Sequence, residues 1–221
     1  MSIHQRLFQG ALALCVLMVS LTACAADNQI ITADPRDYLL QFEDLPSGVS
    51  YVIPEADVLS IPNEMALEAF GEEKGRAIIT EEERIIGWRV HYQANDPAQA
   101  DVQVYLASVV QHQSAKGART AVEKYNNAAL FPDGGWVVEQ ATFQLGDETV
   151  VESAPTQDAQ GRKAISYRVE FAYRNISVDV LVFGLEDKVS VDDAKRAATT
   201  ILARLKVAPL GSGPLAAPEE E

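Results

Sequence analysis

The sequence predicts an α+β fold in which an antiparallel sheet of about six strands is covered by helices. Three observations predict this class. Several segments alternate apolar and polar residues with a period of two, which is typical of half-buried strands. Short turn sequences join consecutive strand segments, so neighbouring strands should run antiparallel. Segments with apolar residues at helical spacing separate the strand groups and should cover at least one face of the sheet.

Four segments carry helical spacing. Residues 36–45 have it and end at Pro46 and Gly48. Asn63 is the expected N-cap of a helix over 64–70. Ser114 is the expected N-cap of another helix, whose apolar stripe runs to Tyr125. The last helix begins at a capping-box pattern over 190–193, and its apolar side chains share one face through residue 205.

The remaining periodic segments are predicted to be extended. In 85–93, Trp88 and Tyr92 lie on the core-facing side and alternate with small or polar residues. The turn sequence over 95–97 should join this strand to the next as a hairpin. The extended segment 49–59 contains Pro54 and is therefore expected to be an edge strand or a bend. The extended segments are 49–59, 77–80, 85–93, 101–111, 136–145, 149–153, 164–174 and 176–184.

The chain divides into a signal peptide over 1–23, a polar tether over 24–34, one domain over 35–207 and a tail over 208–221. The apolar part of the N-terminal segment has about 15 residues and spans about 22 Å as a helix, short of the roughly 30 Å bilayer core. This length favours a cleaved signal peptide over a membrane-spanning helix. The tail is rich in Pro and Gly and ends in three glutamates, a composition typical of disorder.

Leu21-Thr22-Ala23-Cys24, at the end of the apolar run, resembles the lipobox of bacterial lipoproteins. The resemblance implies cleavage before Cys24 and two or three acyl chains on it, which would anchor the protein to the cell membrane or the outer membrane, outside the cytoplasm. The alternative is an ordinary secretory signal, cut at an Ala-x-Ala-like site. Cys15 is lost with the signal, so the processed protein would keep no free thiol.

The element order over residues 36–207 resembles the α/β/α sandwich of Mog1 and PsbP-like proteins, a fold also met in mycobacterial lipoproteins of the LpqN type. The turn Gly146-Asp147-Glu148 is similar to one found before a strand in a class of bacterial lipoproteins. The resemblance implies a binding or assembly accessory rather than an enzyme.

Candidate catalytic and metal-binding residues are few. His91 and His112 would bind zinc only if the hairpin register brought them together, and otherwise they are ordinary strand histidines. The glutamates at 72–73 and 81–83 would suit a cation or a glycosidase site, but adjacent glutamates in turns are normally solvated. The sequence contains no nucleophile elbow, phosphate loop or calcium loop, and it indicates no cofactor and no metal.

Aromatic residues offer one candidate ligand groove. Trp88 and Trp136 each follow a glycine, which can leave room for a stacked ligand or for the indole itself. We expect any groove to lie where Trp88, Tyr92, Trp136 and Tyr167 converge under a helix.

The net charge of −14 argues against nucleic acid as a partner, because phosphate binding needs a basic surface. The sequence therefore predicts a membrane-anchored, non-catalytic binding or accessory domain, with the membrane and an envelope protein as partners. A small-molecule or lipid carrier with a cavity between sheet and helices is the first alternative. A hydrolase with an unrecognised site is the second, and it would need converging carboxylates with shifted pKa values.

Overall fold

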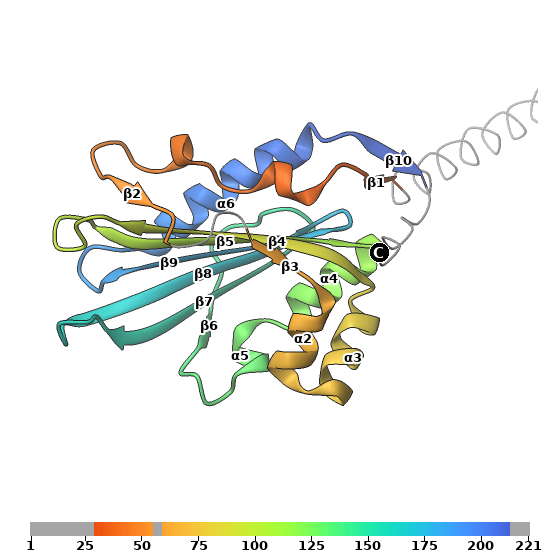
Figure 1. Ribbon diagram of the computed structural model, residues 1–221, viewed down its shortest axis with the longest axis horizontal. Helices are drawn as coiled ribbons and strands as arrows, with labels where there is room; N and C mark the ends of the chain where they lie inside the picture. Colours follow the sequence, from red (N-terminus) through yellow and green to blue (C-terminus); the bar gives the residue numbers. More distant parts are fainter. Residues whose placement is uncertain (1–28, 55–58, 213–221) are drawn as a thin grey trace, which may run out of the picture.

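The computed structural model describes residues 29–54 and 59–212, and its framework is an eight-stranded antiparallel sheet (Figure 1). The strand order is β2-β4-β5-β9-β8-β7-β6, and β3 pairs with β4 as well. The long strands are β4 (Arg84–Ala94), β5 (Val102–His112), β7 (Glu148–Gln157), β8 (Lys163–Tyr173) and β9 (Ile176–Leu185). The short strands are β2 (Tyr51–Val52), β3 (Leu59–Ile61) and β6 (Val137–Glu139). The predicted class is confirmed, with eight strands in the sheet where about six were expected.

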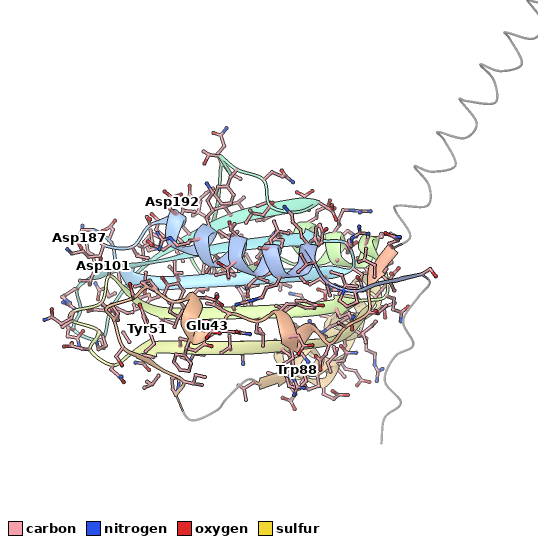
Figure 2. All side chains as sticks on the ribbon, turned by 90° about the horizontal axis from the view of Figure 1, so that it is seen from above. Glu43, Tyr51, Trp88, Asp101, Asp187 and Asp192 are labelled. Atoms are coloured by element: carbon pink, nitrogen blue, oxygen red, sulfur yellow. The ribbon has the colours of Figure 1, made fainter. Side chains whose placement is uncertain are left out.

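One face of the sheet is covered by α6 (Val191–Lys206) and by two 3-10 turns, η1 (Pro35–Tyr38) and η2 (Phe42–Asp44) (Figure 2). Alternate residues of β9, including Val178, Val180 and Val182, face this layer and are buried. The alanine and leucine stripe of α6 packs on them, and the capping box at Ser190 forms as predicted. The main hydrophobic core therefore lies between the sheet and α6.

Four helices cover part of the opposite face: α2 (Asn63–Phe70), α3 (Glu72–Glu81), α4 (Ala115–Lys124) and α5 (Asn127–Leu130). They group beneath one half of the sheet in Figure 1, and together with α6 they complete an α/β sandwich. The Ser114 hydroxyl accepts a hydrogen bond from the Gly117 amide, so the predicted cap of α4 is confirmed. None of the helices in the described residues is both long and apolar enough to cross a membrane.

The predicted boundaries of tether and tail are wrong at two short strands. β1 (Gln29–Ile31) lies within the predicted tether and pairs with β10 (Leu210–Ser212), which lies within the predicted tail. Ile31 is fully buried, and its amide and carbonyl both bond to the side chain of Asn175 in the β8–β9 turn. The reason is packing, because apolar side chains in β1 extend the core beyond the predicted domain.

Several predicted elements differ from the observed ones. The helix expected after an Asn63 cap begins at Asn63 itself, with Pro62 as its N-cap. Of the residues that the structure describes in segment 49–59, only Tyr51–Val52 and Leu59 belong to strands. Residues 36–45 form two 3-10 turns instead of one helix, because side chains of Tyr92 and Arg204 bond the carbonyls of Leu40 and Leu39. Residues 77–80 belong to α3 rather than to a strand, since a short apolar run suits either element. Of the strand predicted over 136–145, only β6 pairs with the sheet.

Gly146 shows why the Gly-Asp-Glu sequence occupies its turn. Its φ is +62°, and a Cβ atom there would lie 2.1 Å from the carbonyl oxygen of Ala172. The Asp147 carboxylate accepts a hydrogen bond from the Arg174 amide at 2.8 Å. Packing against the β8–β9 connection therefore explains why glycine and aspartate occupy this turn.

Asn175→Ala should destabilise the fold by about 3 kcal/mol, because it leaves the buried amide and carbonyl of Ile31 and the carbonyl of His112 without these partners. Urea unfolding of the processed protein measures the change. Asn95→Ala is the matched control, since the exposed Asn95 side chain bonds, within the described part of the chain, only to the Ser50 hydroxyl. Equal losses in the two variants would contradict the structural role given to Asn175.

Candidate functional site

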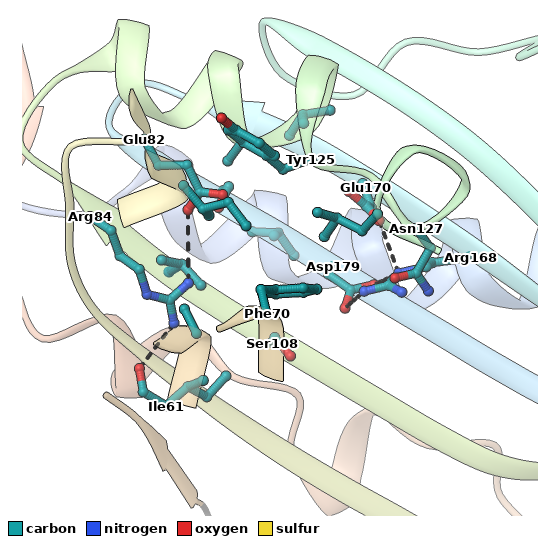
Figure 3. A pocket seen from close by; sticks show the side chains of 18 residues that line it. Ile61, Phe70, Glu82, Arg84, Ser108, Tyr125, Asn127, Arg168, Glu170 and Asp179 are labelled. Atoms are coloured by element: carbon teal, nitrogen blue, oxygen red, sulfur yellow. Dashed lines mark hydrogen bonds and ion pairs between the residues drawn. The ribbon is translucent and has the colours of Figure 1, made fainter. Parts of the chain in front are cut away.

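A cavity of about 200 Å³ lies between the sheet and helices α2 to α5 (Figure 3). Helices and strands contribute apolar side chains, while most of the charged ones come from the strands. The apolar lining residues are Ile61, Ala66, Phe70, Ile78, Val110, Ala121, Val122, Leu130 and Val178. The polar and charged ones are Glu82, Arg84, Ser108, Tyr125, Asn127, Arg168, Glu170, Ser177 and Asp179.

One end of the cavity holds a closed ion-pair network around Arg168. Its guanidinium bonds both carboxylate oxygens of Asp179, with Nε to Oδ1 at 2.6 Å, and it lies 3.0 Å from a carboxylate oxygen of Glu170. Arg168 and Glu170 lie on β8, and Asp179 lies on the neighbouring strand β9, where it pairs with Glu170. The Arg168 donors on this side are therefore used within the protein.

Glu152 on β7 extends this network to helix α5. It is fully buried and accepts hydrogen bonds from the amides of Asn127 and Ala128 at 3.2 and 2.6 Å. Burial raises the pKa of Glu170 well above its ordinary value, Arg168 opposes this rise, and the charges of Asp179 and Glu152 add to it. A raised pKa favours the protonated form of Glu170, which can then donate the hydrogen bond that joins its side chain to that of Glu152.

The other end of the cavity is formed by Glu82, just after α3, and Arg84 at the start of β4. Burial raises the pKa of Glu82 to about 7, although the charge of Arg84 lowers it. The Arg84 Nη1 lies 3.9 Å from a carboxylate oxygen of Glu82, and its Nη2 donates to the Ile61 carbonyl at 2.9 Å. The buried Arg84 Nε has no hydrogen-bond partner among the described residues. This end is therefore loosely paired.

Gly87 determines where the Arg84 guanidinium lies. A Cβ atom on Gly87 would come within 2.9 Å of Arg84 Nη2 and 3.0 Å of a Val110 methyl carbon. The space beside this glycine is thus filled by Arg84 rather than by a stacked ligand or by the Trp88 indole.

The four aromatic residues predicted to form a groove do not converge. Trp88, Tyr92 and Tyr167 face the α6 layer, and two strands, β5 and β9, separate the strands that carry them. The Trp136 ring lies 5.9 Å from the guanidinium of Arg168, which is on the opposite face. None of the four lines the cavity, so this prediction is wrong. Alternation along each strand places aromatic residues on one face but does not bring them together across strands.

The histidines are also apart. His112 pairs with Arg84, whereas His91 lies seven residues further along β4, roughly 20 Å away. Burial lowers the pKa of His112 to about 3, so the ring is neutral; its Nδ1 donates to the Glu82 carbonyl and its Nε2 accepts from the Ser177 hydroxyl. No group of three potential metal ligands occurs in residues 29–54 and 59–212.

The acidic clusters divide between surface and interior. Glu72 and Glu73 are exposed as expected, and Glu81 is exposed and pairs with Lys124 at 2.9 Å. Glu82 is buried, so the expectation of a fully solvated cluster over 81–83 is wrong. The cause is the turn from α3 into β4, which directs this side chain beneath α4. Cys24 lies outside the described residues.

The residues missed by the sequence argument carried a recognisable pattern. Arg168, Glu170 and Asp179 lie at alternate positions of β8 and β9, and apolar residues such as Val169, Phe171 and Val180 occupy the positions next to them. Since helices were expected to cover the sheet, charged residues on its second face should have been expected to be buried and paired.

No family model matches the chain, and no curated protein matches it. Among solved structures it is similar to the extracellular domain of PknH from Mycobacterium tuberculosis, with a TM-score of 0.50 and 14% sequence identity. The match covers 80% of this chain and 98% of that one. The two share a fold. At this identity the likeness concerns the fold alone.

Glu82→Gln should remove a pH dependence of stability. Between about pH 4.5, the ordinary pKa of this carboxyl, and about pH 7, the folded state binds a proton that the unfolded chain has lost. Glu82 therefore makes stability fall as pH rises through this window, by up to about 3 kcal/mol. The stability of the variant relative to the wild type should rise accordingly between pH 4 and pH 8 in urea unfolding.

The groups that face Glu82 from neighbouring elements are Arg84 on β4, His112 on β5 and Tyr125 after α4. His112 is neutral throughout this window, and the pKa of Tyr125 is raised, first by burial, so neither changes charge. Glu81→Gln alters the exposed neighbour and should keep the wild-type slope. A slope unchanged in Glu82→Gln would mean that another group titrates.

Proposed function

We propose that the protein is a membrane-anchored lipoprotein whose domain acts outside the cytoplasm as a non-catalytic binding domain, with the cavity as its ligand site. The observation that carries the binding role is the cavity itself, which combines an apolar wall with the loosely paired Glu82 and Arg84. Ligand sites typically have this composition of apolar walls and a few placed polar groups.

The charges favour a small polar ligand over a lipid. A volume of about 200 Å³ is below the range typical of drug-sized ligands. An acyl chain against the buried Glu82 and Arg84 would leave their charges without polar partners, which is costly. A small ligand with its own polar groups avoids this cost.

Binding is also better supported than hydrolysis. General acid–base catalysis by carboxylates needs two that are free to exchange protons. Asp179 is held in a two-point ion pair by Arg168, and Glu170 is held by Arg168 and Glu152. Glu82 remains as the single carboxyl of the cavity wall without such a network.

The lipid anchor is proposed from the lipobox. Cys24→Ser should abolish incorporation of a clickable palmitate analogue and release the protein from the membrane fraction, because the serine hydroxyl does not form the thioether. Cys15→Ser, within the signal peptide, is the matched control and should leave labelling unchanged. Mass spectrometry of the processed N-terminus gives the cleavage site. An unlabelled wild type cut at another site would refute the lipobox.

Filling the cavity should abolish ligand retention. Ala121 on α4 lines the cavity, so Ala121→Leu would occupy its volume, while Ala203→Leu on the exposed side of α6 is the control. Each processed protein is incubated with a small-molecule extract of the cells that make it, washed, denatured and analysed by mass spectrometry. At least one compound should be retained by the wild type and the control but not by Ala121→Leu. Identical retention in all three would exclude the cavity as the site.

A further inference from the structure

The Glu82–Arg84 end of the cavity offers one acceptor and one donor that the protein does not fully use. The two charges lie 3.9 Å apart, at the limit of an ion pair, although their side chains are only 8% and 13% exposed. The Arg84 Nε is buried and has no partner among the described residues. A buried guanidinium normally satisfies its donors, so this arrangement points to a ligand.

The opposite end of the cavity does not compete for the same ligand. Arg168 is engaged by Asp179 and Glu170, and Glu170 by Glu152. Breaking one of these contacts would leave a buried charge without its partner, which is strongly unfavourable. A ligand should therefore be recognised by its charges at Glu82 and Arg84 and by its shape elsewhere.

The balance of charge selects the ligand class. Above its pKa of about 7, Glu82 is ionised and compensates the charge of Arg84, so a ligand with a net charge would leave one buried charge unmatched. A ligand that carries both an anion and a cation leaves none. Figure 3 shows both side chains at one side of the cavity, with Phe70 between them and the Arg168 network. The two charges of the ligand must therefore be close together, at one end of an apolar body.

We propose that the cavity binds a free α-amino acid with an apolar side chain. Its carboxylate would bind Arg84, its ammonium group would bind Glu82, and its side chain would pack on Phe70, Ile78 and Val110. The volume of about 200 Å³ suits one such molecule. In a peptide the two terminal charges are further apart, so the arrangement favours the free amino acid. This inference rests on the proposed binding function and names its ligand class.

Calorimetric titration of the processed protein at about pH 8, above the pKa of Glu82, tests this class. The probes are L-leucine, L-valine, L-methionine and L-phenylalanine, with leucinamide and N-acetyl-leucine as analogues that each lack one charge. At least one amino acid should bind, and for leucine both analogues should bind at least about 10-fold more weakly, the discrimination expected from one charged contact. An analogue that binds as tightly as leucine would overturn the proposal.

Two substitutions assign the contacts. Glu82→Gln should weaken leucine binding about 10-fold and remove most of the preference for leucine over N-acetyl-leucine. Arg84→Gln should do the same for the preference over leucinamide. Glu81→Gln and Arg89→Gln, on neighbouring residues that do not line the cavity, should leave both ratios unchanged. The ratio of affinities for two analogues is measured within one variant, so a general loss of stability cannot produce the same result. Arg84→Lys is a second variant that keeps the charge.

The two proposals fail differently. Compounds retained by the wild type but not by Ala121→Leu, combined with no binding of any amino acid, would overturn the amino-acid inference and leave the binding function in place. Retention that is identical in wild type and Ala121→Leu would overturn both. If the ratios of affinity for leucine and its analogues are unchanged in Glu82→Gln and Arg84→Gln, these residues do not bind the charged groups of the ligand.

Discussion

The alternation of side chains along β9 constrains both faces of the sheet at once. Val178, Val180 and Val182 must face α6 to complete the main core, and this places Ser177 and Asp179 on the opposite face. Asp179 then lies beside Arg168 and Glu170 of β8 through the strand register. A one-residue slip would bury the charges under α6 and expose the valines, so the core and the ion-pair network fix the same register.

The four helices on the second face cover these charges, and this cover gives the cavity its character. Withdrawal from water makes each buried charge costly unless it is paired. At Arg168 the charge is balanced by Asp179, and Glu170 and Glu152 extend the polar contacts to α5. At Arg84 the pairing is loose, although the surroundings are similarly buried. The contrast between the two arginines distinguishes a part of the cavity that supports the fold from a part available to a ligand.

Much of the fold could be predicted from the sequence. The long strands and α6 follow from sustained periodicity and from the capping box at Ser190, which are local properties. The short strands β1 and β10 could not be predicted, because their pairing depends on contacts between the two ends of the chain. The Glu82 end of the candidate site was missed for a similar reason. Glu82 was expected in a solvated turn, and only the packing of α4 over that turn buries it.

The pairing of β1 with β10 has a consequence for how the domain would sit at a membrane. Gln29 is five positions after Cys24, a contour length of at most about 18 Å. A lipid on Cys24 would hold the end of the domain that carries β1 and β10 close to the bilayer. Asp101 and Asp187 lie at the other end in Figure 2, about 36 Å away along an 11-residue strand. The short connection would thus keep the β1–β10 end of the domain near the bilayer and direct the end with Asp101 and Asp187 away from anionic headgroups.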